Sequence, residues 1–179
     1  MVRSELADNG PGSQSHTLAL ELRRRGHEVC FAASGGAFVP VIEASGFAVR
    51  IVRELAQDRH TPLAVMRAIL KMASIIRAER PSVIHGHNGA ATICAFLAGL
   101  LCGRRIPCVT SVRGVEERAS HAWRNRIWRH LPGVLIGVCR KTRERLIGFG
   151  VNPARMVVSY NGVDTARFDP ALVDRAGTA

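Results

Sequence analysis

The sequence predicts an α/β protein with a doubly wound parallel sheet, a sheet covered by helices on both faces. Short apolar segments of strand length alternate with segments that carry apolar residues at helical spacing. Glycine or proline separates most of these segments. Strands that alternate with helices favour a parallel sheet, because each helix returns the chain to the edge where the next strand starts. The 179 residues, 47% of them hydrophobic, suffice for one domain with a substantial core.

Each expected element has a local basis. The first helix carries Leu18 and Leu22 four residues apart, and Gly26 ends it after three arginines. Thr61 is a suitable N-cap for the longest helix, and Pro62 suits its first position. Gly150 closes the last helix. Expected helices occupy residues 13–25, 39–44, 62–80, 90–102, 116–130 and 140–149; expected strands occupy residues 27–33, 47–52, 82–87, 108–112, 134–138 and 156–160.

The start of the chain departs from this pattern. In a doubly wound fold, a glycine loop follows a central apolar strand, but only Met1, Val2 and Arg3 precede the stretch that leads to the loop here. We therefore expect that most of the first strand is missing and that an unfilled slot lies beside the central strands. Exposed ladder groups in such a slot predict marginal stability.

Composition limits the function without selecting it. The net charge of +11 implies an anionic surface or ligand, such as nucleic acid, membrane or phosphate. Five cysteines without a C-x-x-C spacing indicate neither a disulfide framework nor a zinc cluster. The longest apolar stretch, residues 90–102, is too short to cross a membrane. No export leader opens the chain, so the expected location is cytoplasmic.

Two segments near expected strand ends are candidates for ligand binding. Residues 10–14, Gly-Pro-Gly-Ser-Gln, let backbone N–H groups approach a phosphate at a helix start, although an ordinary turn has the same composition. His85 and His87 lie on one face of a strand, at the carboxyl end where such sheets bind ligands. A hydrogen-bonding or proton-accepting pair and a structural pair remain alternatives. No third ligand is near, so we expect no metal site. Asn88 follows in a loop that would line the same pocket.

Basic residues provide two further candidates. Arg113, followed by Gly114, ends the next strand, where it suits an anionic group or is simply exposed. The stretch from Arg118 to His130 carries Trp123, Arg124, Trp128 and Arg129. Such a helix suits an anionic membrane surface or RNA, and the alternative is a solvated helix with one buried tryptophan.

Three segments in order resemble the amino-terminal half of a family 4 glycosyltransferase of the GT-B fold. They are the glycine segment 10–14, the pair His85 and His87, and a run through residues 160–164 and 168–170, Tyr-Asn-Gly-Val-Asp and Phe-Asp-Pro. The resemblance covers about residues 3–170. Cys139 departs from it, since similar chains usually have serine there.

The resemblance implies a Rossmann-like amino-terminal domain at residues 1–170 and a tail or linker at residues 171–179, with the nucleotide-sugar-binding second domain absent from this sequence. It implies that His87 is catalytic, hydrogen-bonding the transferred sugar. Gly10, Gly12 and Ser13 are the implied contacts to the donor; His85, Asn88, Arg113 and Gly114 are the implied acceptor-side residues.

The implied activity is transfer of a sugar, with retention, from a nucleotide sugar to a carbohydrate or lipid-linked acceptor. We expect no cofactor and no metal, and little activity from this chain without a second domain. The basic tryptophan-bearing stretch favours surface polysaccharide, lipopolysaccharide or glycolipid synthesis, on the inner face of the plasma membrane. The alternative is a non-catalytic basic module that binds nucleotide or RNA; strong salt-dependent RNA affinity would identify it.

Overall fold

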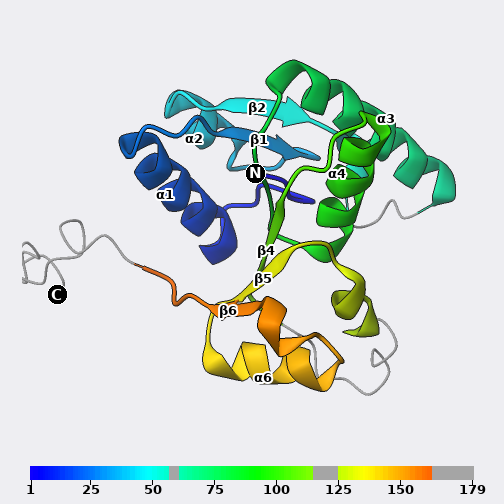
Figure 1. Ribbon diagram of the computed structural model, residues 1–179. Helices are drawn as coiled ribbons and strands as arrows, with labels where there is room; N and C mark the ends of the chain where they lie inside the picture. The colour runs from blue at the N-terminus through cyan, green and yellow to red at the C-terminus, as the bar shows by residue number, and fades with distance from the viewer. Residues whose placement is uncertain (57–60, 115–124, 163–179) are drawn as a thin grey trace, which may run out of the picture.

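The computed structural model describes residues 1–56, 61–114 and 125–162 and contains the expected parallel sheet (Figure 1). β1 (Cys30–Ala33) pairs with β2 (Ala48–Ile51). β3 (Ile84–Gly86), β4 (Cys108–Val112), β5 (Val134–Gly137) and β6 (Met156–Val158) pair in that order, and every described pairing is parallel. β4 has the predicted bounds, and the other strands are shorter than the sequence predicts.

The first residues of the chain join the two groups of strands, which corrects the prediction of an unfilled slot. Val2 forms parallel bridges to Ala32 of β1 and to Gly86 of β3. Its N–H donates to the carbonyl of His85 at 2.8 Å, and its carbonyl accepts from the N–H of His87 at 2.9 Å. The few residues at the amino terminus are enough to fill the space between β1 and β3, because these strands are themselves only four and three residues long.

The helices begin where side chains cap them. α1 (Gly10–Arg24) starts before the predicted residue 13, because the side chain of Asn9 accepts from the N–H of Gly12 and caps the helix. α3 (Pro62–Glu79) starts as predicted, with the side chain of Thr61 accepting from the N–H of Ala64. The part of the chain that the structure describes also contains α2 (Val39–Ala44), α4 (Gly89–Leu101) and α6 (Arg140–Gly148), with single-turn 3₁₀ helices at Arg53–Leu55 and Pro153–Arg155.

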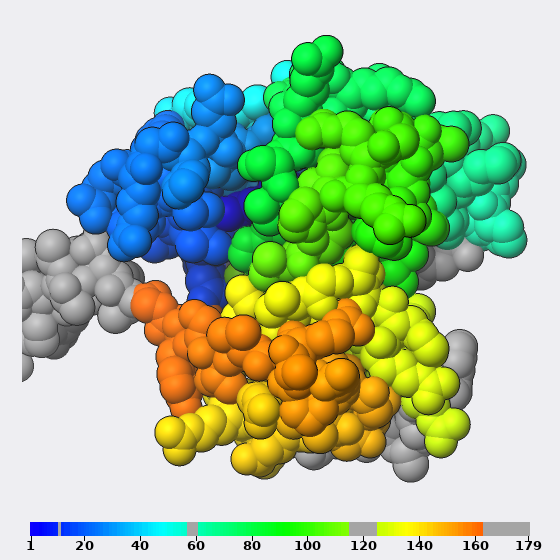
Figure 2. All heavy atoms as spheres, in the orientation of Figure 1, coloured from blue at the N-terminus to red at the C-terminus, as the bar shows by residue number. Residues whose placement is uncertain are grey.

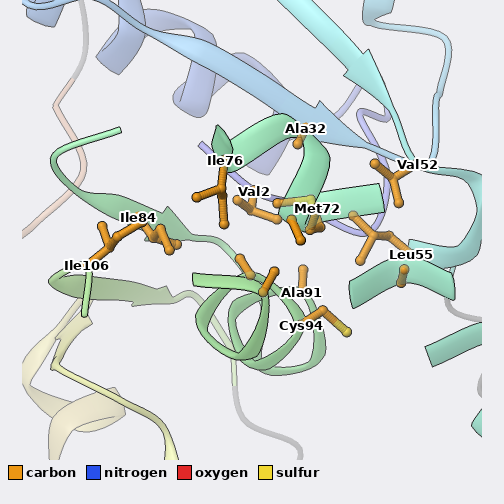
Figure 3. Packing of buried hydrophobic residues seen from close by; sticks show 14 of the residues in the cluster. Val2, Ala32, Val52, Leu55, Met72, Ile76, Ile84, Ala91, Cys94 and Ile106 are labelled. Carbon is orange, nitrogen blue, oxygen red and sulfur yellow. The ribbon is translucent and has the colours of Figure 1, made fainter. Parts of the chain in front are cut away.

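Side chains on opposite faces of β1 enter different cores, as a two-sided sheet requires. Ala32 packs toward α3 and α4, together with Val2, Met72 and Ile84 (Figure 3). Its neighbours Phe31 and Ala33 pack instead with side chains of α1 and α2. A third cluster joins β4, β5 and β6 to α6, with Val112, Leu131, Leu135, Leu146, Val151 and Met156 buried.

The expected helix at residues 116–130 is found only in part. Residues 115–124, including Trp123 and Arg124, lie outside the described residues. Asn125 is α-helical, and the segment Arg126–His130 that follows it is a 3₁₀ helix. Within it Trp128 is half-buried and packs against the cluster of β4, β5 and α6, while Arg129 is exposed. Trp128 therefore contributes to packing, as expected of one tryptophan in the alternative of a solvated helix.

Candidate active site at the carboxyl edge of the sheet

The glycine segment forms the first turn of α1 and not a loop. Gly12 has no room for a side chain, because a Cβ there would lie 2.0 Å from the carbonyl oxygen of Ala7. At Gly10 no atom lies within 4 Å of such a Cβ. The hydroxyl of Ser13 donates to the carbonyl of Gly10 at 3.1 Å. The close approach therefore makes glycine necessary at Gly12 and leaves Gly10 replaceable on steric grounds.

His85 and His87 share one face, as the two-residue spacing predicts. Their rings stack with centroids 4.5 Å apart and planes 17° apart. Nε2 of His85 lies 2.8 Å from the hydroxyl of Ser111 on β4. Burial, and then the charges of the amino terminus and Arg113, lowers the pKa of His85 to about 4. Burial also holds the pKa of His87 well below its ordinary value, with His85 and Arg113 adding to the effect. Both rings are therefore neutral at pH 7.

Arg113 fixes the tautomer of His87. Nη2 of Arg113 lies 3.2 Å from Nδ1 of His87. Guanidinium can only donate, so Nδ1 accepts and the proton of the neutral ring sits on Nε2. This Nε2–H is buried and has no hydrogen-bond partner in the described part of the chain. The residue that follows β3 thus holds a preset hydrogen-bond donor, which is buried.

The side chain of Asn88 makes hydrogen bonds within the fold. Its side-chain oxygen accepts from the N–H of Ala91 at 2.8 Å and caps α4, while its amide donates to the hydroxyl of Ser4 at 2.7 Å. It therefore ties the start of α4 to the amino-terminal strand. Gly114 ends the described part of β4's loop, and nothing crowds a Cβ there.

A groove of about 850 Å³ runs between α1 and the face of β3, β4 and β5. His85, Ser111 and Arg113 lie along it, and Tyr160 and Asn161 border it. The side chains of Gln14 and Asn161 are hydrogen-bonded. The glycine segment 10–14 and the start of the run 160–164 therefore meet at this groove. Figure 2 shows α1, in blue, and the orange end of the described chain on the same side of the molecule.

Sequence reasoning missed Arg3 and Ser15. Nη1 of Arg3 lies 3.3 Å from the hydroxyl of Ser15, which is fully buried and donates to the carbonyl of Gly12. The charge of Arg3 contributes to the lowered pKa values of both Arg113 and His87. A basic residue at the carboxyl end of the first strand is the signal for Arg3 in the sequence, and the expectation that most of this strand is missing hides it.

Residues 1–56, 61–114 and 125–162 contain no group of three His, Cys, Asp or Glu side chains arranged to hold a metal ion. No helix within these ranges is both long and apolar enough to cross a membrane.

Comparison with known proteins assigns this arrangement to a family. A model of Glycosyltransferase Family 4 matches residues 9–167. The chain belongs to this family. Among curated proteins, N-acetyl-alpha-D-glucosaminyl L-malate synthase of Bacillus anthracis is 31% identical over 110 residues, which are 60% of this chain and 29% of the synthase.

Solved structures agree with the glycosyltransferase fold. A glycosyltransferase from Rickettsia africae has a TM-score of 0.74 at 17% identity; the match covers 97% of this chain and 46% of that one. The Anabaena protein HepE in complex with UDP has a TM-score of 0.69 at 16% identity, over 95% of this chain and 46% of its own. At these identities the structures show the fold alone: a Rossmann-like half of a GT-B glycosyltransferase. The family 4 chain spans less than half the length of these relatives.

Proposed function

We propose that this protein transfers a sugar from a nucleotide-sugar donor to an acceptor, with retention of the anomeric configuration, and that this chain provides the acceptor side of the site. The single observation that carries the proposal is the preset Nε2–H donor of His87 at the carboxyl end of β3. It lies where open parallel sheets bind ligands, in a chain of Glycosyltransferase Family 4.

The roles follow from chemistry at that edge. His87 donates to a hydroxyl of the transferred sugar, and Arg113 holds its ring so that Nε2 carries the proton. The first turn of α1 at Gly10, Gly12 and Ser13 brings the positive helix end near the donor diphosphate, while the N–H groups of Gly12 and Ser13 themselves bond to Asn9. Charge that develops on the leaving diphosphate is then met by preorganised dipoles, which is an effective form of catalysis.

The donor and acceptor classes are supported by relatives. HepE has been solved with UDP and with UDP-glucose, which supports a nucleotide sugar as donor. Other similar folds are MurG of Acinetobacter baumannii and the lipopolysaccharide outer core galactosyltransferase WaaB. We therefore favour a carbohydrate or lipid-linked acceptor of the cell envelope, with the protein acting in the cytoplasm at the inner membrane surface. No cofactor or metal takes part in this scheme.

Replacing His87 tests the proposal. We expect His87→Ala in the full protein to lower kcat/KM for sugar transfer about 100-fold, because a buried donor aimed at the reacting sugar is lost. His87→Gln, which keeps an N–H donor, should retain more activity than His87→Ala. Transfer is measured with radiolabelled UDP-sugars and envelope lipid or oligosaccharide acceptors. The exposed Arg67→Gln on α3 is the control. Activity of His87→Ala within twofold of the unchanged protein would contradict the role.

A further inference from the structure

In the part of the chain that the structure describes, the last turns of α4 expose apolar side chains. No charged residue occurs in Gly89–Leu101. Leu97, Leu100 and Leu101 are 39%, 41% and 52% exposed. Their spacing of three and four residues puts them on one face of the helix. They lie toward the amino edge of the sheet, because α4 leads from the end of β3 to the start of β4. A helix that is apolar on all sides is normally buried, so this face indicates a partner.

An apolar hollow of about 360 Å³ adjoins these leucines. Leu100 lines it, and the other apolar lining residues are Phe96, Ile106, Pro107, Cys108 and Pro132. The segments 105–108 and 132–133 that contribute to the hollow lead into β4 and β5. The hollow therefore lies at the amino edge of the sheet, opposite to the edge that carries His87 and Arg113.

The same amino edge carries arginines without acidic residues. The segments 80–83, 102–107, 129–133 and 152–155 precede β3, β4, β5 and β6, and none of them contains Asp or Glu. They contain five arginines: Arg80, Arg104, Arg105, Arg129 and Arg155. Hydrogen bonds hold the segments together, since Arg104 donates to the carbonyl of Pro81 at 3.3 Å and Arg155 to that of Gly133 at 2.9 Å. The arginines thus form one basic edge.

An anionic bilayer matches this combination of apolar and basic groups. Arg80, Arg105 and Arg129 are exposed, and Arg105 also lines the hollow. Glu79, the acidic residue next to Arg80 in the sequence, is paired with Arg50 at 2.7 Å and so does not neutralise this edge. Leucines can enter the layer between lipid headgroups and acyl chains, while arginines around them bind lipid phosphates.

Two other partners match this surface less well. A second copy of the chain would bring the same arginines together, and the net charge of +11 would oppose that contact. RNA would suit the arginines, but RNA-binding surfaces stack bases on exposed aromatic rings. The exposed apolar residues of α4 are leucines, which favour lipid.

We propose that the end of α4, the adjoining hollow and the arginines of the amino edge form a docking surface for an anionic membrane. The inference deepens the proposed function and rests on it for the membrane as the place of action. Docking through the amino edge leaves the carboxyl edge, with His87, free to take up the donor. Arg129, which the sequence predicts to face a membrane, belongs to this docking surface.

Sedimentation of the full protein with lipid vesicles tests the apolar part of the docking surface. The vesicles contain phosphatidylcholine alone or equal amounts of phosphatidylcholine and phosphatidylglycerol. We expect binding to the mixed vesicles and not to phosphatidylcholine alone, and added salt should weaken it. Leu97→Ser/Leu101→Ser should lower the vesicle partition coefficient about tenfold, because two inserted side chains are lost.

The arginines are tested in the same assay. Arg105→Gln/Arg129→Gln should lower the partition coefficient about fivefold, because two contacts to lipid phosphate are lost. Arg105→Lys/Arg129→Lys keeps both charges and should keep most of the binding, which separates a binding role from a failure to fold. Val41→Ser/Ile51→Ser is the matched control for the leucines. It changes side chains that are 44% and 46% exposed on α2 and β2, and it should leave binding unchanged.

Three results would overturn the proposal. They are vesicle binding of Leu97→Ser/Leu101→Ser equal to that of the unchanged protein, an equal loss in the Val41→Ser/Ile51→Ser control, and filter binding of RNA by a protein that does not bind the mixed vesicles. Vesicle binding needs no turnover. His87→Ala should therefore bind vesicles like the unchanged protein while it loses sugar transfer, so that failure of the proposed function and failure of the docking surface are seen separately.

Discussion

Acidification is expected to destabilise the chain by about 2 kcal/mol between pH 7 and pH 5 through His85 alone. The ordinary histidine pKa is 6.5, and burial lowers that of His85 to about 4. Below pH 6.5 the unfolded chain therefore binds a proton that the folded chain does not. Stability falls as pH falls through this window, and the loss is complete once pH drops below about 4. The lowered pKa of His87 acts in the same direction.

The measurement is urea unfolding at pH 7, 6 and 5, compared between the unchanged chain and His85→Gln. Glutamine does not titrate, so the variant should show a smaller loss of unfolding free energy over the same window. The range stops at pH 5 because carboxylates with lowered pKa values, such as Glu54, titrate at more acidic pH. Parallel pH profiles for the two proteins would mean that His85 is not buried as a neutral ring.

Gly86→Ala is expected to destabilise the chain by about 3 kcal/mol. A Cβ at Gly86 would lie 1.7 Å from Oγ1 and 2.8 Å from Cβ of Thr92, whose side chain is fully buried on α4. Thr92 cannot rotate away freely, because its hydroxyl donates to the carbonyl of Asn88. The methyl group would therefore push α4 away from β3. The shift would also reach His87 and Asn88, the cap of α4, because these two residues directly follow Gly86.

A double-mutant cycle with Thr92→Ala tests this steric explanation. Removing Oγ1 relieves the shortest contact, so Gly86→Ala/Thr92→Ala should be less destabilised than the sum of the single variants. Gly148→Ala is the matched control, since nothing lies within 4 Å of a Cβ at that helical position. Additive effects in the cycle would show that the contact between β3 and α4 is looser than described.

Long periodic segments were predictable because local signals and burial agree in them. The start of α3 at Thr61 and Pro62 needed only the cap and the apolar stripe. The start of α1 was missed because the cap of Asn9 draws Gly10 and Gly12 into a helical turn, against the usual use of glycine in loops. The pairing of the amino-terminal residues with the sheet was not predicted, because it depends on the strands on either side and not on the length of the segment. Val2 pairs with both β1 and β3.

The site was predictable only as far as strand spacing reaches. A two-residue spacing places His85 and His87 on one face, and both rings stack as expected. The pairing of His87 with Arg113 depends on β3 and β4 being neighbours, which no local pattern encodes. Asn88 was assigned to the pocket, yet it caps α4, because a residue between a strand and a helix can serve either purpose. The place of Arg3 beside Ser15 becomes visible only in the structure, because it depends on Val2 lying between β1 and β3.

The most direct test of the central claim is a crystal structure of the full protein with a nucleotide sugar. The account predicts that the sugar lies at the carboxyl end of β3, with one hydroxyl accepting a hydrogen bond from Nε2 of His87 and the diphosphate near the first turn of α1. A sugar bound away from His87, or a nucleotide sugar that does not bind at millimolar concentration, would contradict the assignment of this edge as the site of transfer.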